Sequence, residues 1–407
     1  MKDFNLTDFI NSYVVYRNES LFTEDIANCT EALNNGIYGK SILVIGGAGS
    51  IGSSYIKQVI KYEPSELFVV DTNENALTEL IRDLRCSGVS LPKKITTYPM
   101  DYNSSTFQHM FSNHVSGAKK GFDIVSNFSA HKHVRSEKDI YSTEALIRNN
   151  IINAKRLLDL LEHFPPKQYF CVSTDKAANP VNIMGASKRI MEDLIFSYSS
   201  SFTVRTARFA NVAFSNGSLP DSFLKRLSLG QPITAPTDTK RYFVSPEESG
   251  QICMLATIFG DNRDIFFPKL DSAKMQTFDK IAVNLLENMG YKIEFCSSDK
   301  EAIEKSLKRS ESDPYPVFFS ESDTSGEKKY EEFYIEGEKV DLTTFKSLGI
   351  IKDKQIPDKY RVIGLIDSLE KAFDGSVCTK SDVVKILSEY LPNFEHIETG
   401  KNLDEKM

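Results

Sequence analysis

The sequence predicts an α/β fold built on a Rossmann-like, doubly wound parallel sheet. Short apolar runs at residues 40–45, 66–70, 122–127 and 168–172 have the length and composition of buried strands. Segments with a helical spacing of apolar residues separate these runs, and strands that alternate with helices favour a parallel sheet with right-handed crossovers. A smaller α/β lobe for substrate and helical extensions at both ends of the chain complete the expected architecture.

The composition limits the class of protein. The chain has 407 residues, a formal net charge of −7 and a hydrophobic content of 41%, as in an ordinary globular protein with a full core. We therefore expect no nucleic-acid partner. No apolar run reaches the length of about 18 residues that predicts a membrane span, and the six cysteines form no Cys-x-x-Cys pair. We expect a cytoplasmic protein without a bound metal.

A glycine-rich turn follows the first predicted strand. The segment Gly-Gly-Ala-Gly-Ser-Ile-Gly at 46–52 stands between that strand and a helical pattern. Glycines in this context allow a tight turn and a close approach of a pyrophosphate to the N-terminus of a helix. An aspartate ends the next strand about twenty residues later, where an acid binds the ribose hydroxyls of adenosine. The predicted dinucleotide-binding residues are Gly46, Gly49, Ser50, Ile51, Gly52 and Asp71.

Other strand ends extend this predicted site. Asp101 closes a further strand at the adenine edge, and Ser129 and Ala130 follow another strand, where small side chains let a cofactor pass closely. The expected cofactor is NAD and not NADP. The carboxylate of Asp71 would repel the 2′-phosphate of NADP, and residues 72–75 include no arginine or lysine to offset it.

The candidate catalytic residues follow a predicted buried strand. Ser-Thr-Asp-Lys at 173–176 lies where that strand leaves the sheet, and ligands of open α/β sheets bind at this edge. Asp175 and Lys176 can face one pocket as acid and base. Met184 and Lys188 stand four residues apart on an expected helix, so both point to the same face. An isolated Asp-Lys pair is more often a solvated turn, so the remaining motifs decide between the two interpretations.

Two basic segments are each open to a second interpretation. His-Lys-His at 131–133 follows a strand end, where either a solvated turn or a binding site explains it. Arg241 stands beside aromatic residues, as a diphosphate-binding arginine does, and a surface arginine on an edge strand fits equally well.

Together, the motifs of the chain resemble those of the extended short-chain dehydrogenase/reductases, and within them the nucleotide-sugar 4,6-dehydratases of bacterial polysaccharide and glycan biosynthesis. Besides the glycine turn, the matching segments are His-Lys-His-Val (131–134), Ser-Thr-Asp-Lys-Ala-Ala-Asn-Pro (173–180), Met-Gly-Ala-Ser-Lys (184–188), Arg-Phe-Ala-Asn-Val (208–212), Asn-Gly-Ser (216–218), Arg-Tyr-Phe (241–243) and Gly-Glu-Lys-Lys-Tyr-Glu-Glu (326–332). They occur in the order of the family and cover roughly residues 40 to 335.

One substitution narrows the resemblance to a subgroup of these dehydratases. The short-chain pattern normally carries a tyrosine four residues before the lysine, whereas this chain has Met184 before Lys188. A motif with methionine at this position resembles that of the dehydratases whose catalytic half is usually fused to a membrane domain. We expect a soluble, free-standing relative without that domain.

The resemblance implies a reaction. UDP-N-acetylglucosamine is converted to UDP-2-acetamido-2,6-dideoxy-xylo-hexos-4-ulose by oxidation at C4, elimination of water across C5 and C6, and return of the hydride to C6. Lys176 is implied as the C5 base, with a pKa lowered by burial near the cofactor and Lys188, and Asp175 as the acid for the C6 hydroxyl. Lys188 is expected to hold the nicotinamide ribose and act on the C4 hydroxyl through Thr174. Thr174, a water or Asp175 could replace the missing tyrosine.

The resemblance also implies a substrate site and leaves alternatives. The expected substrate-binding residues are Lys132, His133, Asn211, Ser218, Arg241 and Glu327. A nucleotide-sugar 4-epimerase shares the first hydride step but needs no acid–base pair for elimination. The same dehydratase could act on a GDP-linked sugar or invert C5, and a non-catalytic nucleotide-binding protein would explain the missing tyrosine. We expect a homo-oligomer.

Four segments are expected along the chain. They are a helical N-terminal extension (1–39), an NAD-binding Rossmann domain (40–210, with a return segment near 245–270), a lobe that mostly binds substrate (211–375) and a helical C-terminal tail (376–407).

Overall fold

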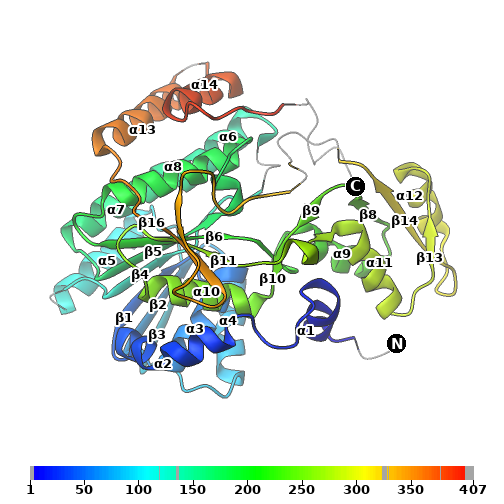
Figure 1. The fold of residues 1–407 in the computed structure, drawn as a ribbon, viewed down its shortest axis with the longest axis horizontal. Helices are drawn as coiled ribbons and strands as arrows, with labels where there is room; N and C mark the ends of the chain where they lie inside the picture. Colours follow the sequence, from blue (N-terminus) through cyan, green and yellow to red (C-terminus); the bar gives the residue numbers. More distant parts are fainter. Residues whose placement is uncertain are drawn as a thin grey trace.

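The computed structural model describes residues 4–118, 120–133, 137–322, 328, 330–375 and 377–398. A nine-stranded sheet forms the centre of this structure. The strand order is β15-β16-β11-β6-β5-β4-β1-β2-β3 (Figure 1). The strands are β1 (Ser41–Ile45), β2 (Glu66–Asp71), β3 (Lys94–Pro99), β4 (Ile124–Asn127), β5 (Gln168–Thr174), β6 (Thr203–Phe209), β11 (Ile265–Pro268), β15 (Lys339–Asp341) and β16 (Leu348–Lys352). The run from β3 to β11 is parallel throughout.

This sheet confirms the predicted Rossmann-like α/β class. All five residues of β1 are buried, as expected of a parallel strand covered on both faces. At the other edge, β16 pairs antiparallel with β11, and β15 pairs antiparallel with β16. The purely parallel sheet that the sequence predicts therefore gains two antiparallel edge strands, and they come from a segment assigned to the substrate lobe.

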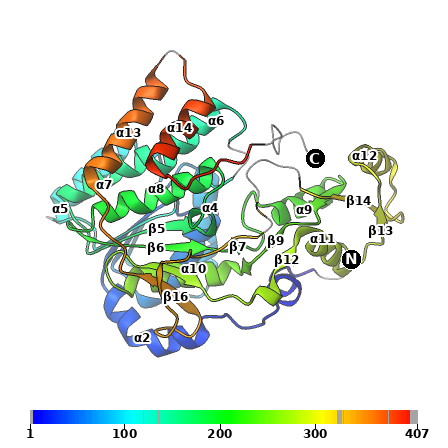
Figure 2. The same ribbon diagram turned by 45° about the horizontal axis from the view of Figure 1, so that its top comes forward.

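Helices cover both faces of the sheet. On one face, α3 (Ser50–Val59) and α10 (Pro246–Ile258) pack together, with α2 (Thr23–Ile37) beside them. On the other face α7 (Asn153–His163) and α8 (Ile183–Ser197) lie against the sheet, and α13 (Lys359–Asp374) and α14 (Lys380–Tyr390) form an outer layer over them (Figure 2). The remaining helices of this part are α4 (Glu74–Cys86), α5 (Ser105–Ala118) and α6 (Ile140–Ile147).

A second, smaller lobe has its own sheet and its own apolar core. Its parallel strands are β13 (Ile293–Phe295), β14 (Tyr315–Ser320) and β8 (Ile233–Pro236), and its helices are α9 (Leu219–Ser228), α11 (Phe278–Asn288) and α12 (Asp299–Lys308). The chain start packs on this lobe, because Phe9 of α1 (Leu6–Phe9) and Val14 belong to its core. The N-terminal extension therefore contacts both lobes, since α2 packs on α10, which covers one face of the main sheet.

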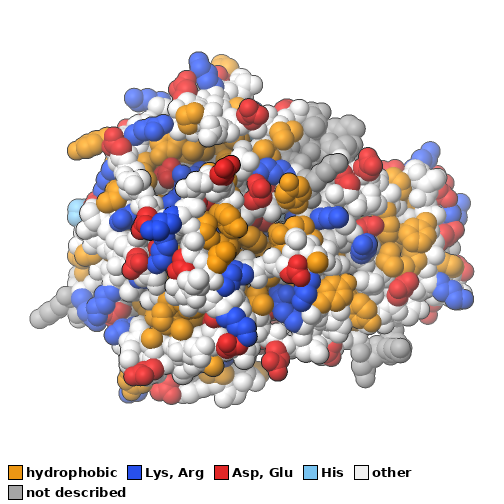
Figure 3. Space-filling view, in the orientation of Figure 1, with side chains coloured by type: hydrophobic (Ala, Val, Ile, Leu, Met, Phe, Trp, Pro, Cys, Tyr) orange, Lys and Arg blue, Asp and Glu red, His pale blue; other side chains and the backbone are white. Residues whose placement is uncertain are grey.

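Short strand pairs connect the two lobes. They are β7 (Asn211–Val212) with β10 (Phe243–Val244) and β9 (Lys240–Arg241) with β12 (Gln276–Thr277). Positive and negative side chains are interspersed over the face drawn in Figure 3. Among the described helices none is long and apolar enough to cross a membrane. The described histidine, cysteine and acidic side chains form no group of three that could hold a metal ion.

Candidate active site

The glycine turn lies between β1 and α3, where the sequence places it. Gly46 has a φ of +71°, and a Cβ at Gly46 would lie 2.7 Å from the backbone nitrogen of Ser129. A Cβ at Gly52 would lie 2.3 Å from the carbonyl oxygen of Gly46. Side chains at these positions would collide with backbone, so only glycine brings the turn this close to the end of β4. Ser50 and Ile51 form the first turn of α3, whose N-terminal amides suit a pyrophosphate.

Asp71 connects the end of β2 to the glycine turn. One carboxylate oxygen accepts a hydrogen bond from the backbone amide of Ala48 at 3.0 Å, and the other accepts one from Asn73 at 2.9 Å. Asp101 lies exposed after β3 and accepts a hydrogen bond from the amide of Asn103. Both acids therefore lie at the carboxyl edge of the sheet, and the residues present fit the adenosine half of a dinucleotide.

A π-helical turn supports the segment after β4, which the sequence did not predict. Arg148–Ile152 forms this turn between α6 and α7. The side chain of Asn150 accepts a hydrogen bond from the amide of His131 at 2.9 Å and donates to the His131 carbonyl and to Ser187, both at 3.0 Å. Ser129 contacts Asn149 in the same turn, at 3.2 Å. The π turn thus holds residues 129–131 beside α8, and such turns occur often at functional sites.

Thr174, Asp175 and Lys176 lie at the carboxyl end of β5, as predicted. The Thr174 hydroxyl donates to Asp175 Oδ1 at 2.9 Å, and that oxygen also accepts from Lys176 Nζ at 3.1 Å. Asp175 is buried, and the Lys176 side chain is 17% exposed. Asp175 Oδ1 therefore contacts both the Thr174 hydroxyl and the Lys176 amine, and the three side chains form a single cluster.

The expected lowering of the Lys176 pKa is wrong for the free protein. Burial lowers the pKa of Lys176, but Asp175 and Glu331 raise it more strongly, so the pKa lies above its usual value. Glu331 Oε1 lies 3.7 Å from Lys176 Nζ. Lys188 is not among the groups that shift the Lys176 pKa. The amine that the resemblance implies as a base is thus held as an ammonium ion between two carboxylates.

Lys188 and Met184 both lie buried on α8. Lys188 Nζ donates to the Val172 carbonyl at 2.9 Å and contacts Met191 Sδ at 3.5 Å. Burial lowers the pKa of Lys188. The structure describes no hydrogen bond between Lys188 and Thr174, so the implied relay between them stays a prediction.

The C-terminal tail reaches the start of α8. The backbone amide of Met184 donates to Glu137 Oε1 at 2.8 Å, and Glu137 Oε2 lies 3.3 Å from His396 Nε2. The amide of Ile397 also donates to the Val181 carbonyl at 3.0 Å. Residues far apart in the sequence therefore fix the beginning of the helix that carries Met184.

The comparisons with known proteins agree with this geometry. A family model described as polysaccharide biosynthesis protein matches residues 42–353. The chain belongs to this family. The resemblance that the sequence motifs indicate is therefore confirmed, and residues 42–353 of this family member include the glycine turn, the Asp175–Lys176 pair and Glu331.

Three relatives show how far the similarity extends. The capsular polysaccharide biosynthesis protein CapD of Staphylococcus aureus is 29% identical over 305 residues, which cover 72% of this chain and 49% of CapD. A UDP-N-acetylglucosamine 4,6-dehydratase (inverting) of Campylobacter jejuni is 27% identical over 268 residues, 63% of this chain and 74% of the relative. The chain spans about half the length of CapD, and 43% of EpsC, a relative from Bacillus subtilis.

Solved structures share the fold of this family member. Pen of Bacillus thuringiensis has a TM-score of 0.62 at 21% identity, over 82% of this chain and 98% of Pen. The dTDP-glucose 4,6-dehydratase DesIV of Streptomyces venezuelae, solved with NAD bound, has a TM-score of 0.54 at 17% identity, over 72% of this chain and 87% of DesIV. At these identities the likeness concerns the fold.

Three predicted substrate-binding residues, Lys132, His133 and Ser218, lie around one loop between the two lobes of the family fold. Lys132 Nζ lies 3.4 Å from Ser215 Oγ, in the loop that leads to Ser218, the N-cap of α9. A Cβ on Gly217 in that loop would lie 3.1 Å from the His133 ring. In the same loop, the backbone amide of Asn216 donates a hydrogen bond to the Ser50 hydroxyl, so the loop also contacts the glycine turn.

Asn211 and Arg241 are two further predicted substrate residues, and both belong to the short strands between the lobes. Asn211 begins β7, and Arg241 in β9 is buried, with Nη1 donating to the carbonyls of Lys240 and Lys328 at 2.9 Å. The structure brings Arg241 into electrostatic range of Lys176. Glu327 lies outside the described residues. The sequence motif 326–332 drew attention to Glu327, whereas the described carboxylate beside Lys176 is Glu331.

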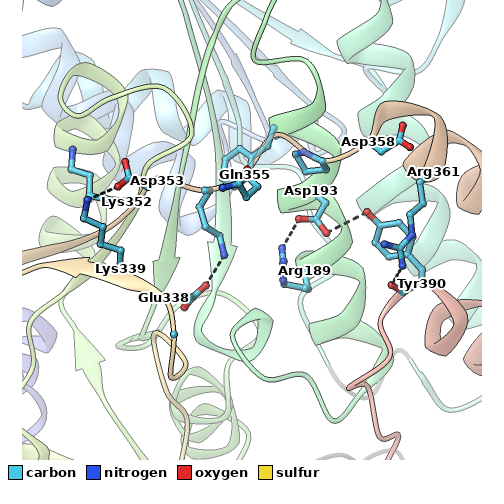
Figure 4. A pocket seen from close by; sticks show the side chains of 14 residues that line it. Arg189, Asp193, Glu338, Lys339, Lys352, Asp353, Gln355, Asp358, Arg361 and Tyr390 are labelled. Carbon is cyan, nitrogen blue, oxygen red and sulfur yellow. Dashed lines mark hydrogen bonds and ion pairs between the residues drawn. The ribbon is translucent and has the colours of Figure 1, made fainter.

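A surface pocket of about 500 Å³ lies on another side of α8, and none of the predicted site residues lines it (Figure 4). Several of its charged side chains pair with one another. Arg189 contacts Asp193 at 2.7 Å, and Lys354 contacts Glu338 at 2.7 Å. Glu338 in turn contacts the buried Arg208 at 3.1 Å. The pocket is therefore the outer end of a charged network that runs inward towards β5 and β6.

Proposed function

We propose that this protein is an NAD-dependent nucleotide-sugar 4,6-dehydratase that acts on UDP-N-acetylglucosamine in bacterial surface glycan biosynthesis. The Asp175–Lys176 pair at the end of β5 carries this proposal, because elimination of water across C5 and C6 needs a base and an acid in one pocket. A 4-epimerase needs no such pair. The relative from Campylobacter jejuni named for this activity supports the substrate class.

Each residue of the cluster has a place in this reaction. NAD, when bound, accepts a hydride from C4 of the sugar and returns it to C6. Thr174 and Lys188 would assist loss of the C4 hydroxyl proton. Lys176 would remove the C5 proton and pass a proton to Asp175, which would then protonate the departing C6 hydroxyl. Asp175 accepts hydrogen bonds from Thr174 and Lys176, so both groups lie close enough to pass a proton to its carboxylate. Arg241, at the lobe junction, would hold the diphosphate.

One assay separates this proposal from the epimerase. Incubation of the protein with UDP-N-acetylglucosamine should yield a product that absorbs in alkali and is lighter by one water, as a 4-keto-6-deoxy sugar is. A product of unchanged mass would favour the epimerase, and a GDP-linked sugar accepted in place of the UDP-linked one would change the nucleotide of the proposal.

The cofactor should be NAD in preference to NADP. Asp71 ends β2 with its carboxylate hydrogen bonded to the glycine turn, so a 2′-phosphate placed there would meet a fixed negative charge. The structure of DesIV with NAD supports the same cofactor. The expected result is that NADH binds the apo-protein at least about tenfold more tightly than NADPH, as measured by the change in fluorescence of the reduced nicotinamide on binding. Equal affinities would contradict the role of Asp71.

We expect the first product to retain the configuration at C5. Lys176 is the only amine that contacts Asp175 in the described residues, so one group would both remove and return the C5 proton on the same face. Met184 also resembles the retaining group of dehydratases. The inverting relative from Campylobacter jejuni favours the alternative. NMR coupling constants of fresh product decide, since an arabino-configured 4-ulose as the first product would contradict retention.

A further inference from the structure

The charge state of Lys176 raises a question that the proposed reaction leaves open. A lysine can take a proton from C5 only as a neutral amine. In the free protein Lys176 lies between the carboxylates of Asp175 and Glu331, which stabilise the ammonium form. The site therefore needs a group that receives the Lys176 proton before C5 reacts.

Glu331 is the second carboxylate beside Lys176, and a small shortening of their contact would bring the two groups within hydrogen-bond distance. Its side chain is 3% exposed, and Oε1 lies 3.7 Å from Lys176 Nζ. Its second oxygen, Oε2, is buried and has no hydrogen-bond partner among the described residues. A buried carboxylate with an unsatisfied oxygen is costly as an anion, and one proton would relieve that cost.

The surrounding chain holds Glu331 in place. Two residues later, the Phe333 carbonyl accepts a hydrogen bond from Nη1 of the buried Arg208 at 2.9 Å. The ring of Phe333 stacks on Phe267 with centroids 5.8 Å apart and contacts Tyr242. The backbone that carries Glu331 is thus attached to the main sheet through a fully buried guanidinium group.

We propose that Glu331 is a positioning residue that holds the Lys176 ammonium group in the free enzyme and receives its proton when substrate fills the site. One N–H bond breaks on Lys176 and one O–H bond forms on Glu331, so an ion pair becomes a neutral pair without any outside reactant. A bound sugar that excludes water favours the neutral pair, because burial disfavours both charges. The inference rests on the proposed function for its catalytic meaning.

The other charges around the pair are consistent with this transfer. Burial raises the pKa of Glu331, Lys176 lowers it, and Asp175 raises it. Arg241 and Lys328 face the same group and lower that pKa, and Arg241 also lowers the pKa of Lys176. A substrate diphosphate that neutralises Arg241 would raise the pKa of both groups, so the exclusion of water around the pair is what drives the transfer.

The pKa of Lys176 can be measured without any turnover. Competitive acetylation with acetic anhydride, followed across pH by mass spectrometry, reports the neutral fraction of the amine. Glu331→Gln should lower the apparent pKa of Lys176 by about one unit or more, because a carboxylate close to the ammonium group is removed. Glu332→Gln is the matched control, since Glu332 is the exposed neighbour, and it should leave the value unchanged. An unchanged Lys176 pKa in Glu331→Gln would overturn the inference.

The pH dependence of C5 exchange tests the transfer itself. In the wild type the proton stays within the pair, so exchange of the C5 proton with deuterium oxide should vary little between about pH 7 and 9. In Glu331→Gln the proton must leave for solvent, so the rate should fall about tenfold per pH unit below the Lys176 pKa. Glu331→Asp keeps an acceptor and should keep the flat profile. A flat, wild-type profile in Glu331→Gln would contradict the transfer, and absence of exchange in the wild type would instead contradict the proposed function.

Discussion

Lys176→Ala is expected to abolish C5 proton exchange and water elimination while NAD remains bound. Lys176 is the amine that lies beside Asp175 at the end of β5, and the glycine turn that would hold the cofactor lies on a different strand. Loss of a positioned acid–base group lowers rates by about 10²-fold to 10⁴-fold, so we expect a fall of about 10³-fold in the formation of the 4-keto product. Deuterium incorporation at C5 and NAD titration measure the two effects separately.

Two further variants make this result specific. Lys280→Ala removes an exposed lysine of α11 in the smaller lobe and should leave both measurements at the wild-type level. Lys176→Ala leaves Glu331 without its cation, so Lys176→Ala/Glu331→Gln removes both charges and tests whether any loss of stability comes from that carboxylate. Wild-type C5 exchange in a folded Lys176→Ala variant would show that another group is the base.

The parts of the site that follow single strands could be predicted from the sequence. The apolar run before Ser173 and the glycines after β1 are local signals, and in a parallel sheet the carboxyl ends of neighbouring strands meet at one edge. Asp175 and Lys176 are adjacent in sequence, so their contact required no knowledge of distant packing. The predicted roles of these residues stay predictions until the variants are measured.

The parts that depend on distant segments could not be predicted. Glu331 reaches Lys176 only because Arg208 and Phe333 attach its segment to the main sheet, and no periodicity reports such a contact. The π-helical turn that carries Asn150 has the same apolar spacing as an uninterrupted helix. No strand is predicted at residues 348–352, and the antiparallel place of β16 beside β11 is decided by packing against a distant segment.

The raised pKa of Lys176 depends on distant packing only in part. Burial lowers this pKa, and the adjacent Asp175 raises it. A further rise comes from Glu331, which belongs to another part of the chain. A pKa is therefore predictable from sequence only as far as the charged neighbours are local.

Arg208→Met is expected to destabilise the main sheet by about 3–5 kcal/mol, because it leaves Glu192 buried without its partner. Arg208 makes two hydrogen bonds of 2.9 Å to the Glu192 carboxylate, and both side chains are fully buried. Glu192 also accepts from the Ser173 hydroxyl at 2.7 Å, so the pair supports the end of β5. Hydrogen exchange of amides in β5 and β6 measures the local free energy of opening.

The pH dependence of this loss has a defined sign. Burial would raise the pKa of Glu192, but Arg208 lowers it to about 2 in the wild type. The stabilisation is therefore complete above the unfolded pKa of about 4.3 and is lost as the pH falls through about 2. In Arg208→Met the buried carboxyl has a raised pKa instead, so its penalty grows as the pH rises above about 4.3. The difference between the two proteins should shrink as the pH is lowered from 7 to 4.

A surface pair provides the matched control for the Arg208 prediction. Lys339 and Asp353 form an ion pair whose side chains are 74% and 66% exposed, so Lys339→Met should change the opening free energy by less than about 1 kcal/mol. Arg208→Met/Glu192→Met replaces both buried charges by apolar side chains and should recover much of the loss, since Glu192 is no longer left unpaired and Glu338 keeps its contact with Lys354. If the double variant opened as readily as Arg208→Met, the loss would stem from the Phe333 and Glu338 contacts of Arg208, and the Glu192 pair would not be its cause.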